Sequence, residues 1–507
     1  MAALPTSTVV AVVGTGAMGS GIAQIAAAAG HRVVMFDSRP GAAGTATASL
    51  GAQYARLAEK GRMSAADAQA AAGRIAAAAT LADLAPAGLV VEAIVEDLDA
   101  KRTLFRDLEA LVAPDAILAT NTSSISITAI AAGLAHPGRV AGLHFFNPAP
   151  LMPLVEVICG LVTDPAVMDT LFDTAAAWGK TPVRATTTPG FIVNRVARPY
   201  YGEALRLRSE CAADSATIDA LCREAGGFRM GPFELMDMIG LDVNFAVTRS
   251  VWNAYFQDPR FTPSLIQQEL VAAGLLGRKT GRGFYDYREG AARPAPATEA
   301  PQSVPQRIEL HGASVAAGAL AARLLARNVP FTRHAGDGDR IAVVDGVTVC
   351  VTDGRTATQR AAKSGQPATA VIDLALDYAK VERLAFAPAL QCPAADAARV
   401  AGLLQAAGIA ATRVADTPGL VLMRTVAMLA NEAADAVNQG VCSADGADTA
   451  MRLGTNYPRG PLAWADAVGV RGVVTVLENL GAHYGEDRYR VSPWLRLRAD
   501  AGVNCHD

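Results

Sequence analysis

Short apolar runs alternate with helical stretches through the first third of the chain. The runs consist of small and branched residues without an alternating polar face, which is typical of strands buried on both sides of a parallel sheet. Two intervening segments, 17–29 and 98–111, have helical composition. Strands and helices that alternate in this way predict an α/β fold. The predicted strands are residues 9–13, 33–36, 89–94, 116–119, 140–146, 154–158 and 181–184.

The pattern changes after residue 188. From residue 191 the apolar positions follow a helical period, and helices are expected over 191–211 and 215–224. Residues 288–305 are rich in Pro, Ala and Glu and have no period, which predicts a linker. Strand-like and helical runs then alternate again between residues 307 and 415.

The first strand leads into a glycine turn. Residues 9–37 read VVAVVGTGAMGSGIAQIAAAAGHRVVMFD, so that a strand, a G-x-G-x-x-G turn, a helix, a second strand and an acid follow in order. This order predicts a Rossmann dinucleotide-binding domain. Gly14 allows the tight turn, Gly16 lets the backbone approach a pyrophosphate, and Gly19 lets the helix pack on the strand. Asp37 is placed to accept hydrogen bonds from a ribose 2′-OH, which favours NAD over NADP.

The last region of the chain repeats the helical region. TPGF at 188–191 matches TPGL at 417–420, and GPF at 231–233 matches GPL at 460–462, both at an offset of 229 residues. An ungapped offset across a whole domain indicates a duplication. Asn194 of the first copy is replaced by Met423 in the second, which suggests that Asn194 does chemistry and Met423 packs.

These patterns predict a fold in four parts. A Rossmann dinucleotide-binding domain is followed by an all-α domain, then by a degenerate Rossmann-like α/β region without the glycine fingerprint, and then by a second copy of the all-α domain. The predicted bounds are 1–188 with a helical-hairpin insertion at 42–79, then 189–290, a linker at 291–305, 306–416 and 417–507.

The composition narrows the class of protein. Of the 507 residues, 51% are hydrophobic and 18% are charged, and the net charge of −3 gives no electrostatic footprint for nucleic acid. The seven cysteines form no C-x-x-C pair, which argues against a disulfide framework or a metal site and for a reducing compartment. No signal-peptide pattern or long uncharged apolar run is present, so we expect a cytoplasmic protein that does not enter a membrane.

Polar residues follow several predicted strands at their carboxyl ends, where open parallel sheets bind ligands. Glu96, Asn121 and Ser123 lie at such ends, although helix N-caps have the same appearance. His144 and Glu156 lie on two neighbouring strands joined by a proline-rich turn. They are either a His–carboxylate pair with a basic second nitrogen, or a core histidine satisfied by backbone.

Two further segments have basic residues and two interpretations each. The hairpin at 42–79 carries Arg56, Lys60 and Arg62 near its tip, and is either a solvated pair of helices or a clamp for a long anionic ligand. The Gly-rich basic loop at 277–286 either ends a domain or reaches back to the cofactor phosphates.

The motifs together resemble the bacterial 3-hydroxyacyl-CoA dehydrogenases, including the 3-hydroxybutyryl-CoA dehydrogenases. The matching segments cover residues 8–287 and are VGTGAMGSGIA, VVEAIVED, ATNTSSIS, GLHFFNPAPLMPLVEVI, PGFIVNR, GPFELMDMIGLDV and GRKTGRGFYDY. The additional half resembles the long form of the family found in phenylacetate degradation, whose substrate is 3-hydroxyadipyl-CoA. This second resemblance rests on architecture rather than on a substrate motif.

The resemblance assigns roles to individual residues. It implies that His144 is the catalytic base, that Glu156 pairs with it, and that Ser123 and Asn194 hold the substrate oxygens. NAD⁺ would take a hydride from C3 of an (S)-3-hydroxyacyl-CoA while His144 removes the hydroxyl proton. Lys60 would contact the coenzyme A moiety. The implied cofactor contacts are Gly14, Gly16, Ala17, Met18, Gly19, Asp37, Glu96, Lys101, Asn121, Ser123, Asn147 and Lys279.

Three alternatives stay open. The first is a 3-hydroxybutyryl-CoA dehydrogenase of short-chain fatty acid metabolism. The second is a β-hydroxyacid dehydrogenase that uses no coenzyme A, and the third is a catalytically silent NAD-binding protein. A substrate with a carboxylate tail calls for a cation, for which Arg195, Arg198 and Arg229 are candidates. Because the helical domain of short family members mediates dimerisation, copies 190–290 and 419–503 are expected to pack on each other as an intrachain pseudo-dimer. A homodimer of the whole chain stays open.

Overall fold

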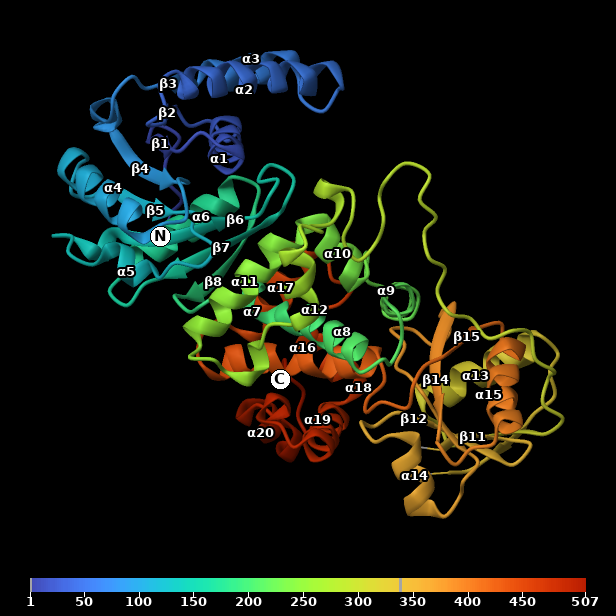
Figure 1. Ribbon diagram of the computed structural model, residues 1–507. Coiled ribbons are helices and arrows are strands. Elements are labelled where there is room, and N and C mark those ends of the chain that lie inside the picture. The colour runs from blue at the N-terminus through green and yellow to red at the C-terminus, as the bar shows by residue number, and fades with distance from the viewer. Residues whose placement is uncertain (1, 337–339) are drawn as a thin grey trace. The chain divides into compact units, whose positions relative to one another are not determined.

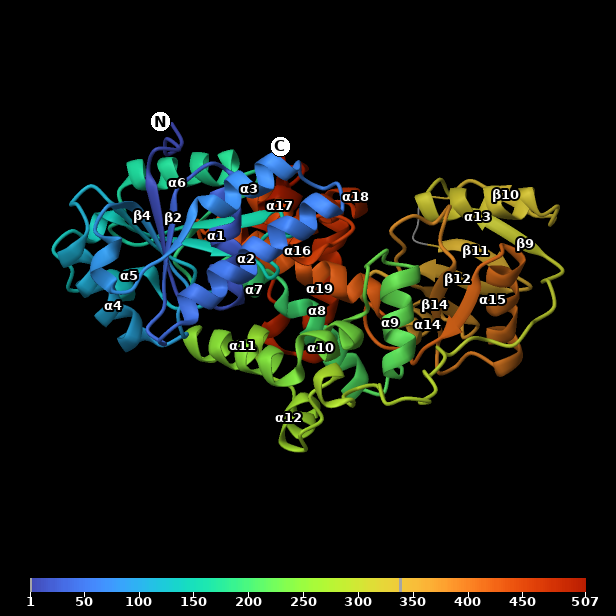
Figure 2. The ribbon, with the colours of Figure 1, turned by 90° about the horizontal axis from the view of Figure 1, so that it is seen from above.

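The computed structural model describes residues 2–336 and 340–507, and the chain forms two compact units. The N-terminal unit comprises Met1–Arg195 with Gln439–Thr455, and the C-terminal unit comprises Val196–Asn438 with Asn456–Asp507. One segment of the second helical copy therefore belongs to the N-terminal unit. Figures 1 and 2 show the elements of each unit from two directions.

The N-terminal unit is built on one mixed sheet. In the described part of the chain its strands lie in the order β3-β2-β1-β4-β5-β6-β7-β8, and every neighbouring pair is parallel except β6 and β7. The strands are β1 (Val9–Val13), β2 (Val33–Phe36), β3 (Ile75–Ala77), β4 (Ala87–Glu92), β5 (Ile117–Thr120), β6 (Val140–Phe145), β7 (Leu154–Cys159) and β8 (Thr181–Thr186). The helices are α1 (Ala17–Ala28), α2 (Ala42–Glu59), α3 (Ala65–Gly73), α4 (Leu98–Leu111), α5 (Ile127–Ala131), α6 (Pro165–Ala177) and α17 (Ala444–Thr455), and α7 (Val193–Val196) follows β8 at the unit boundary.

The predicted Rossmann domain is confirmed, and two predicted elements, one inside it and one after it, are corrected. The hairpin helices α2 and α3 lie side by side in both views (Figures 1 and 2), but the predicted 42–79 insertion is not wholly helical, because residues 75–77 form the edge strand β3. The helix expected over 191–211 is broken at Ala197. Pro199 explains the break, since proline has no N–H to donate and fits the first turn of a new helix, α8.

The C-terminal unit holds the second sheet and most of the helices. The sheet order is β10-β9-β11-β12-β13-β14-β15, in which β11 is antiparallel to both neighbours. Its strands are β9 (Ile308–His311), β10 (Thr332–His334), β11 (Arg340–Val344), β12 (Val347–Val351), β13 (Thr369–Ile372), β14 (Arg383–Pro388) and β15 (Ala410–Arg413). The helices are α8 (Arg198–Ser209), α9 (Ser215–Glu224), α10 (Pro232–Ile239), α11 (Leu241–Ala254), α12 (Leu265–Ala272), α13 (Val315–Ala326), α14 (Ala357–Ser364), α15 (Ala394–Ala406), α16 (Leu422–Asn438), α18 (Pro461–Val468), α19 (Val470–Tyr484) and α20 (Pro493–Ala501).

The two helical copies pack against each other within the chain. Helix α8 of the first copy lies along α16 of the second. The offset of 229 residues relates Glu203 to Glu432, and each forms an ion pair with an arginine of the other copy. Arg488 reaches Glu203 at 2.6 Å, and Arg260 reaches Glu432 at 3.3 Å. This reciprocal arrangement is the pattern of a twofold interface, as expected for a pseudo-dimer.

The copies also exchange one helix each. Helix α9 of the first copy packs on β14 of the second sheet, and the matching helix α17 of the second copy packs on β7 and β8 of the first. An ion pair between Arg383 and Glu224 at 2.9 Å holds α9 on its sheet. A hydrogen bond from the Thr186 N–H to the Val441 carbonyl oxygen at 3.0 Å holds the segment before α17 on the other sheet. Each sheet is therefore covered by a helix of the other repeat.

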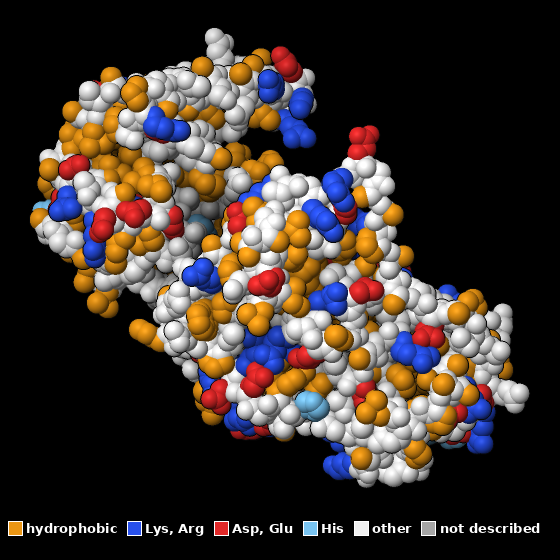
Figure 3. Space-filling model, viewed as in Figure 1, with side chains coloured by type: hydrophobic (Ala, Val, Ile, Leu, Met, Phe, Trp, Pro, Cys, Tyr) orange, Lys and Arg blue, Asp and Glu red, His pale blue; other side chains and the backbone are white. Residues whose placement is uncertain are grey.

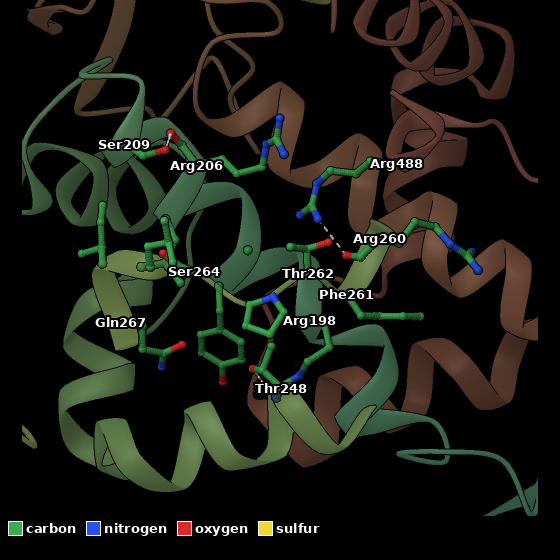
Figure 4. A pocket seen from close by; sticks show the side chains of 16 residues that line it. Arg198, Arg206, Ser209, Thr248, Arg260, Phe261, Thr262, Ser264, Gln267 and Arg488 are labelled. Atoms are coloured by element: carbon green, nitrogen blue, oxygen red, sulfur yellow. Dashed lines mark hydrogen bonds between the residues drawn. The ribbon is translucent and has the colours of Figure 1, made fainter. Parts of the chain in front are cut away.

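The pocket in Figure 4 lies inside the C-terminal unit, beside the reciprocal ion pairs. Arg488 donates to the carbonyl oxygen of Arg260 there at 2.8 Å. Arg198, a candidate for binding a carboxylate tail, is buried and donates to the Thr248 hydroxyl at 3.1 Å.

The surface and the helices add two observations. On the face shown in Figure 3, basic and acidic side chains are interspersed, and basic ones gather at the tip of the α2–α3 hairpin, where Arg56, Lys60 and Arg62 are exposed. Within residues 2–336 and 340–507, none of the helices has the length and apolar character needed to cross a membrane.

Candidate active site

The glycine turn after β1 has the geometry that its three glycines predict. Gly14 has a φ of 95°, and a Cβ there would lie 2.5 Å from the carbonyl oxygen of Ala93. A Cβ on Gly19 would lie 1.8 Å from the carbonyl oxygen of Gly14, so only glycine lets α1 approach the strand this closely. A Cβ on Gly16 would meet nothing within 4 Å. The open side of Gly16 leaves room for a pyrophosphate at the N-terminus of α1.

Asp37 follows β2 and lies beside this turn. Its Oδ2 accepts hydrogen bonds from the backbone N–H and the hydroxyl of Thr15, at 2.9 and 2.7 Å. Arg39 donates to both carboxylate oxygens, and its guanidinium is largely exposed. These hydrogen bonds, that from Arg39 first, hold the pKa of Asp37 well below its ordinary value although burial opposes the shift. Asp37 is therefore ionised and fixed in place.

An open cavity of about 1,120 Å³ lies beside the glycine turn. Gly16 and Ala17 line it on one side, α2 on another and the turn from Asn147 to Leu151 on a third. Met18 does not line it and packs, partly buried, against the core of the unit. Arg62 lines the cavity, and Lys60 is exposed nearby in sequence but is not part of the wall. The cavity brings the glycine turn and the predicted clamp together in one unit.

A buried lysine connects the beginning of α4 to the last residue of β4. Lys101 is 1% exposed and its Nζ lies 2.6 Å from Glu92 and 3.3 Å from Glu96. Glu92 also accepts from the Thr120 hydroxyl at 2.7 Å. Two carboxylates thus share one ammonium group. Through these contacts Lys101 holds the loop after β4 in place.

Glu96 connects this loop to the end of β5. Its Oε1 accepts from the Thr122 hydroxyl at 2.6 Å and from the Ser123 N–H at 3.0 Å. Burial opposes ionisation, but these hydrogen bonds and the charge of Lys101 lower the pKa of Glu96. Asn121 accepts from the Phe145 N–H at 2.8 Å and so ties β5 to the end of β6. The polar residues at the strand ends form one network rather than separate helix caps.

His144 and Glu156 face each other directly across β6 and β7. The Nδ1 atom lies 2.6 Å from Oε2 of Glu156, and both side chains are buried. Because a carboxylate only accepts, Nδ1 carries the proton and Nε2 keeps a lone pair. The ring lies near Phe146 and Phe191, with centroid distances of 4.5 and 5.9 Å. The histidine is thus paired with a carboxylate through Nδ1, and it is not a core residue satisfied by backbone.

The second oxygen of Glu156 holds the first turn of the repeated helix. Oε1 accepts from the N–H groups of Ile192 and Val193 at 3.0 and 2.9 Å. The next residue, Asn194, donates from Nδ2 to the carbonyl oxygen of Ser123 at 3.5 Å. The pair at His144, the serine loop and Asn194 are therefore connected through one carboxylate.

The second repeat has the same support without the chemistry. Asp373, after β13, accepts from the N–H groups of Val421 and Leu422 at 3.0 and 2.7 Å, and these residues match Ile192 and Val193 at the offset of 229. Burial raises the pKa of Asp373 to about 6. Met423 stands at the position of Asn194. At the same offset Asp373 stands at the position of His144, and Ala385 stands at that of Glu156. A carboxylate from the neighbouring strand thus holds the helix turn in the second repeat, where the histidine, the glutamate and the asparagine are all replaced.

Lys279, a predicted cofactor contact, belongs to the C-terminal unit. It lies in a short 3-10 turn and its Nζ is 2.5 Å from Asp242. The Gly-rich loop around it is anchored by Asp237, which accepts from the N–H groups of Phe284 and Tyr285 at 3.0 Å each. The loop is therefore a folded element and not a frayed chain end.

The comparisons with known proteins identify the family. Residues 9–188 match the model described as 3-hydroxyacyl-CoA dehydrogenase, NAD binding domain, and residues 190–287 and 419–505 each match its C-terminal domain. The chain is 43% identical, over 97% of both sequences, to 3-hydroxyadipyl-CoA dehydrogenase of Escherichia coli K12. The chain belongs to the 3-hydroxyacyl-CoA dehydrogenase family. It is an oxidoreductase with an NAD-binding domain, as the motifs predicted.

Other relatives of this dehydrogenase cover different shares of it. A crystal structure titled 3-hydroxybutyryl-CoA dehydrogenase from E. coli K12 superposes with a TM-score of 0.90 and 43% identity, over 98% of this chain and 99% of that one. The 3-hydroxybutyryl-CoA dehydrogenase of Clostridioides difficile is 39% identical over 55% of this chain and 99% of its own length. Residues 349–418 match a 3-hydroxybutyryl-CoA dehydrogenase reduced Rossmann-fold domain, which agrees with the degenerate third region.

Sequence reasoning missed three residues of this site. Glu92 forms an ion pair with Lys101, and the Thr122 hydroxyl donates to Glu96. Arg39 donates to the carboxylate of Asp37. A carboxylate inside the apolar run LVVEAI was the available signal for Glu92, because a buried charge requires a partner. Nothing in the sequence pattern distinguishes Arg39 from other surface residues, or the buried Thr122 from the serines and threonines next to it.

Proposed function

We propose that the chain oxidises (S)-3-hydroxyacyl-CoA to 3-oxoacyl-CoA with NAD⁺. The observation that carries the proposal is the buried His144–Glu156 pair, which lies in the same unit as the glycine turn and its cavity. Gly16, Asp37 and the N-terminus of α1 are the groups that would hold the dinucleotide, and the open side of Gly16 fits a pyrophosphate. Bound NAD⁺ supplies the hydride acceptor for C3.

The chain's own residues supply the acid–base chemistry. Nε2 of His144 takes the proton of the C3 hydroxyl, and the Glu156 carboxylate stabilises the imidazolium that forms. Glu156 also keeps the ring in the tautomer with a free Nε2. Ser123 and Asn194 would hold the substrate oxygens, since both are fixed by the network around Glu96 and Glu156. In the reverse direction His144 is the general acid.

The coenzyme A moiety would lie along the α2–α3 hairpin, where Arg62 lines the cavity and Lys60 is exposed. The ionised Asp37 favours NAD over NADP, since a 2′-phosphate would meet its charge. In the described residues all seven cysteines are free thiols, a state that a reducing cytoplasm maintains.

We further propose 3-hydroxyadipyl-CoA as the substrate, because the relative that shares the full length of the chain has that name. The test is the NADH absorbance produced from 3-hydroxyadipyl-CoA and from 3-hydroxybutyryl-CoA. A preference of at least about tenfold in kcat/KM for the adipyl substrate is expected, since one charge-assisted contact to the tail is enough for it. The opposite preference favours the butyryl substrate of the shorter relatives, and no turnover of either contradicts the enzymatic proposal.

A further inference from the structure

Arg39 covers the carboxylate that the sequence predicts to bind the ribose. The side chain of Asp37 is only 7% exposed, whereas that of Arg39 is 71% exposed. Of the described residues that line the cavity beside the glycine turn, Arg39 is one and Asp37 is not. A ligand in this cavity therefore meets the guanidinium group before it meets the carboxylate.

The acceptor positions of the Asp37 carboxylate are all taken within the described residues. Oδ1 accepts from the backbone N–H and from Nε of Arg39, both at 3.0 Å. Oδ2 accepts from Nη2 of Arg39 at 3.0 Å, and from the N–H and the hydroxyl of Thr15 at 2.9 and 2.7 Å. These five donors exceed the roughly four lone-pair positions of a carboxylate. A ribose hydroxyl can therefore bind Asp37 only after the Arg39 side chain has withdrawn.

The outer side of the guanidinium group is available to an anion. A guanidinium group has about five N–H donors in a rigid fork. Asp37 takes one donor from Nε and one from Nη2. Within residues 2–336 and 340–507, Asp37 is the only residue whose side chain accepts from Arg39. The remaining donors point away from the carboxylate, and their planar arrangement matches the oxygens of a phosphate group.

The backbone that follows Arg39 also favours an anion. Helix α2 begins at Ala42, and its N-terminus carries the positive end of the helix dipole. The N-cap is Gly41, which has no side chain to cap the first turn, and that turn contains no acidic residue. A Cβ on Gly41 or Gly44 would meet nothing within 4 Å, so the space beside this turn is open. No carboxylate is among the described residues that line the cavity.

We propose that Arg39 lets the dinucleotide site accept NADP as well as NAD, by donating to the 2′-phosphate from the outer side of its guanidinium group. An arginine beside the ribose accommodates this phosphate in other Rossmann domains. This role rests on the proposed binding of a dinucleotide at the glycine turn. Asp37 sets the preference for NAD, and Arg39 reduces it, because Arg39 competes with the ribose of NAD and contacts the phosphate of NADP.

The test measures binding rather than turnover. The full chain is titrated with NADH by fluorescence, and the NADH is then displaced with NAD⁺ or with NADP⁺, so that all three ligands compete for one site. In Arg39→Gln the affinity for NADP⁺ should fall at least about tenfold, which is the effect of losing a hydrogen bond between charged groups. The affinity for NAD⁺ should rise by up to about fivefold, since an exposed ion pair no longer competes with the ribose.

Arg32→Gln is the matched control. Arg32 is also exposed, but it lies before β2 and outside the wall of the cavity, so its loss removes the same charge from the same unit. Both affinities should change by less than about twofold in this variant, as for most substitutions of exposed residues.

Three outcomes would overturn the proposal. If NADP⁺ at millimolar concentration does not displace NADH, the role of Arg39 is wrong while the proposed function is not, because NADH has bound. If Arg39→Gln loses affinity for NAD⁺ and NADP⁺ by the same factor, the guanidinium group acts only as a general positive charge. If the wild type does not bind NADH, the proposed function fails together with this role of Arg39.

Discussion

Glu156 uses its two carboxylate oxygens for different partners. Oε2 accepts from His144, and Oε1 accepts from the backbone at the start of the repeated helix. The first contact sets the tautomer of the base, and the second fixes the segment that carries Asn194. The acid–base pair and the substrate-holding side chain therefore keep their spacing through a single residue. The sequence placed His144 and Glu156 on adjacent strands, but it contained no sign of the second contact.

The variant His144→Gln tests the base. Glutamine can still donate to Glu156 but has no nitrogen that takes up a proton near neutral pH, so turnover should fall by roughly two to four decades. NADH binding, measured by fluorescence titration, should stay nearly unchanged. Turnover close to that of the wild type would refute the assignment of His144.

Asp37 and Arg39 together test the choice of cofactor. In Asp37→Ser the carboxylate is lost and Arg39 is released, so KM for NAD⁺ should rise at least about tenfold relative to KM for NADP⁺. The matched variant Asp37→Ser/Arg39→Gln should keep the loss with NAD⁺ but show no gain with NADP⁺. Initial rates with both cofactors measure the two ratios. An unchanged ratio in Asp37→Ser argues against Asp37 contacting the ribose.

At the scale of elements, the apolar runs carried most of the information. The strands and α4 were predicted within about two residues, because long unbroken apolar runs have few alternatives in a parallel sheet. Ser64 caps the start of α3 and accepts from the Asp67 N–H at 3.0 Å. The strand β3 was missed because Ile75–Ala77 is short and alanine-rich, and its pairing with β2 is a tertiary effect.

The two repeats provide an internal comparison between Glu156 and Asp373. Both carboxylates hold the first turn of a repeated helix, but only Glu156 also pairs with a histidine. Asp373→Asn should lower the free energy of unfolding by about 1–3 kcal/mol, because its amide nitrogen cannot accept from the N–H groups of Leu374 and Met423 that Oδ1 now holds. Its turnover should equal that of the wild type. Glu156→Gln should in addition lose at least two decades of turnover. Urea unfolding and the NADH assay measure both effects, and a turnover loss in Asp373→Asn would contradict the separation of roles.

For the whole molecule, the repeat and its consequences were predictable to different degrees. The offset of 229 residues identified which segments correspond, and so predicted that the two helical copies pack together. It did not predict that α9 and α17 exchange sheets, because corresponding sequences are equally compatible with either sheet. That choice depends on tertiary contacts such as Arg383 with Glu224.

The buried ion pairs between the copies predict a pH-dependent stability. Burial disfavours ionisation of Glu203, but the charges of Arg488 and Arg424 lower its pKa to about 2. The stability that this carboxylate contributes is therefore complete above its ordinary pKa and is lost as the pH falls toward 2. Glu203→Gln leaves two buried guanidinium groups without their partner, so it should cost about 3–5 kcal/mol at pH 7 and less at pH 3.

The control for that measurement is Glu478→Gln, which removes an exposed carboxylate paired with Arg496. It should cost no more than about 1 kcal/mol at either pH. Equal effects of the two substitutions in urea unfolding would mean that the Glu203 cluster does not stabilise the interface.

A truncation tests the pseudo-dimer as a whole. The C. difficile relative matches 55% of this chain over 99% of its own length, so a chain of about the length of residues 1–290 is compatible with a complete fold. Removing the rest of the chain uncovers the face of α8 that packs on α16 and the edge of β8 that pairs with Val441. Helix α9 loses its sheet at the same time.

In a dimer of the truncated chain each α9 takes the place of α17 on the partner's sheet, which satisfies all three surfaces. We therefore expect light scattering to give a dimer, and this dimer to bind about as little of a hydrophobic dye as the intact chain at the same concentration. A monodisperse monomer with low dye binding would show that the first copy needs no partner, and that the duplication has a purpose other than covering these surfaces.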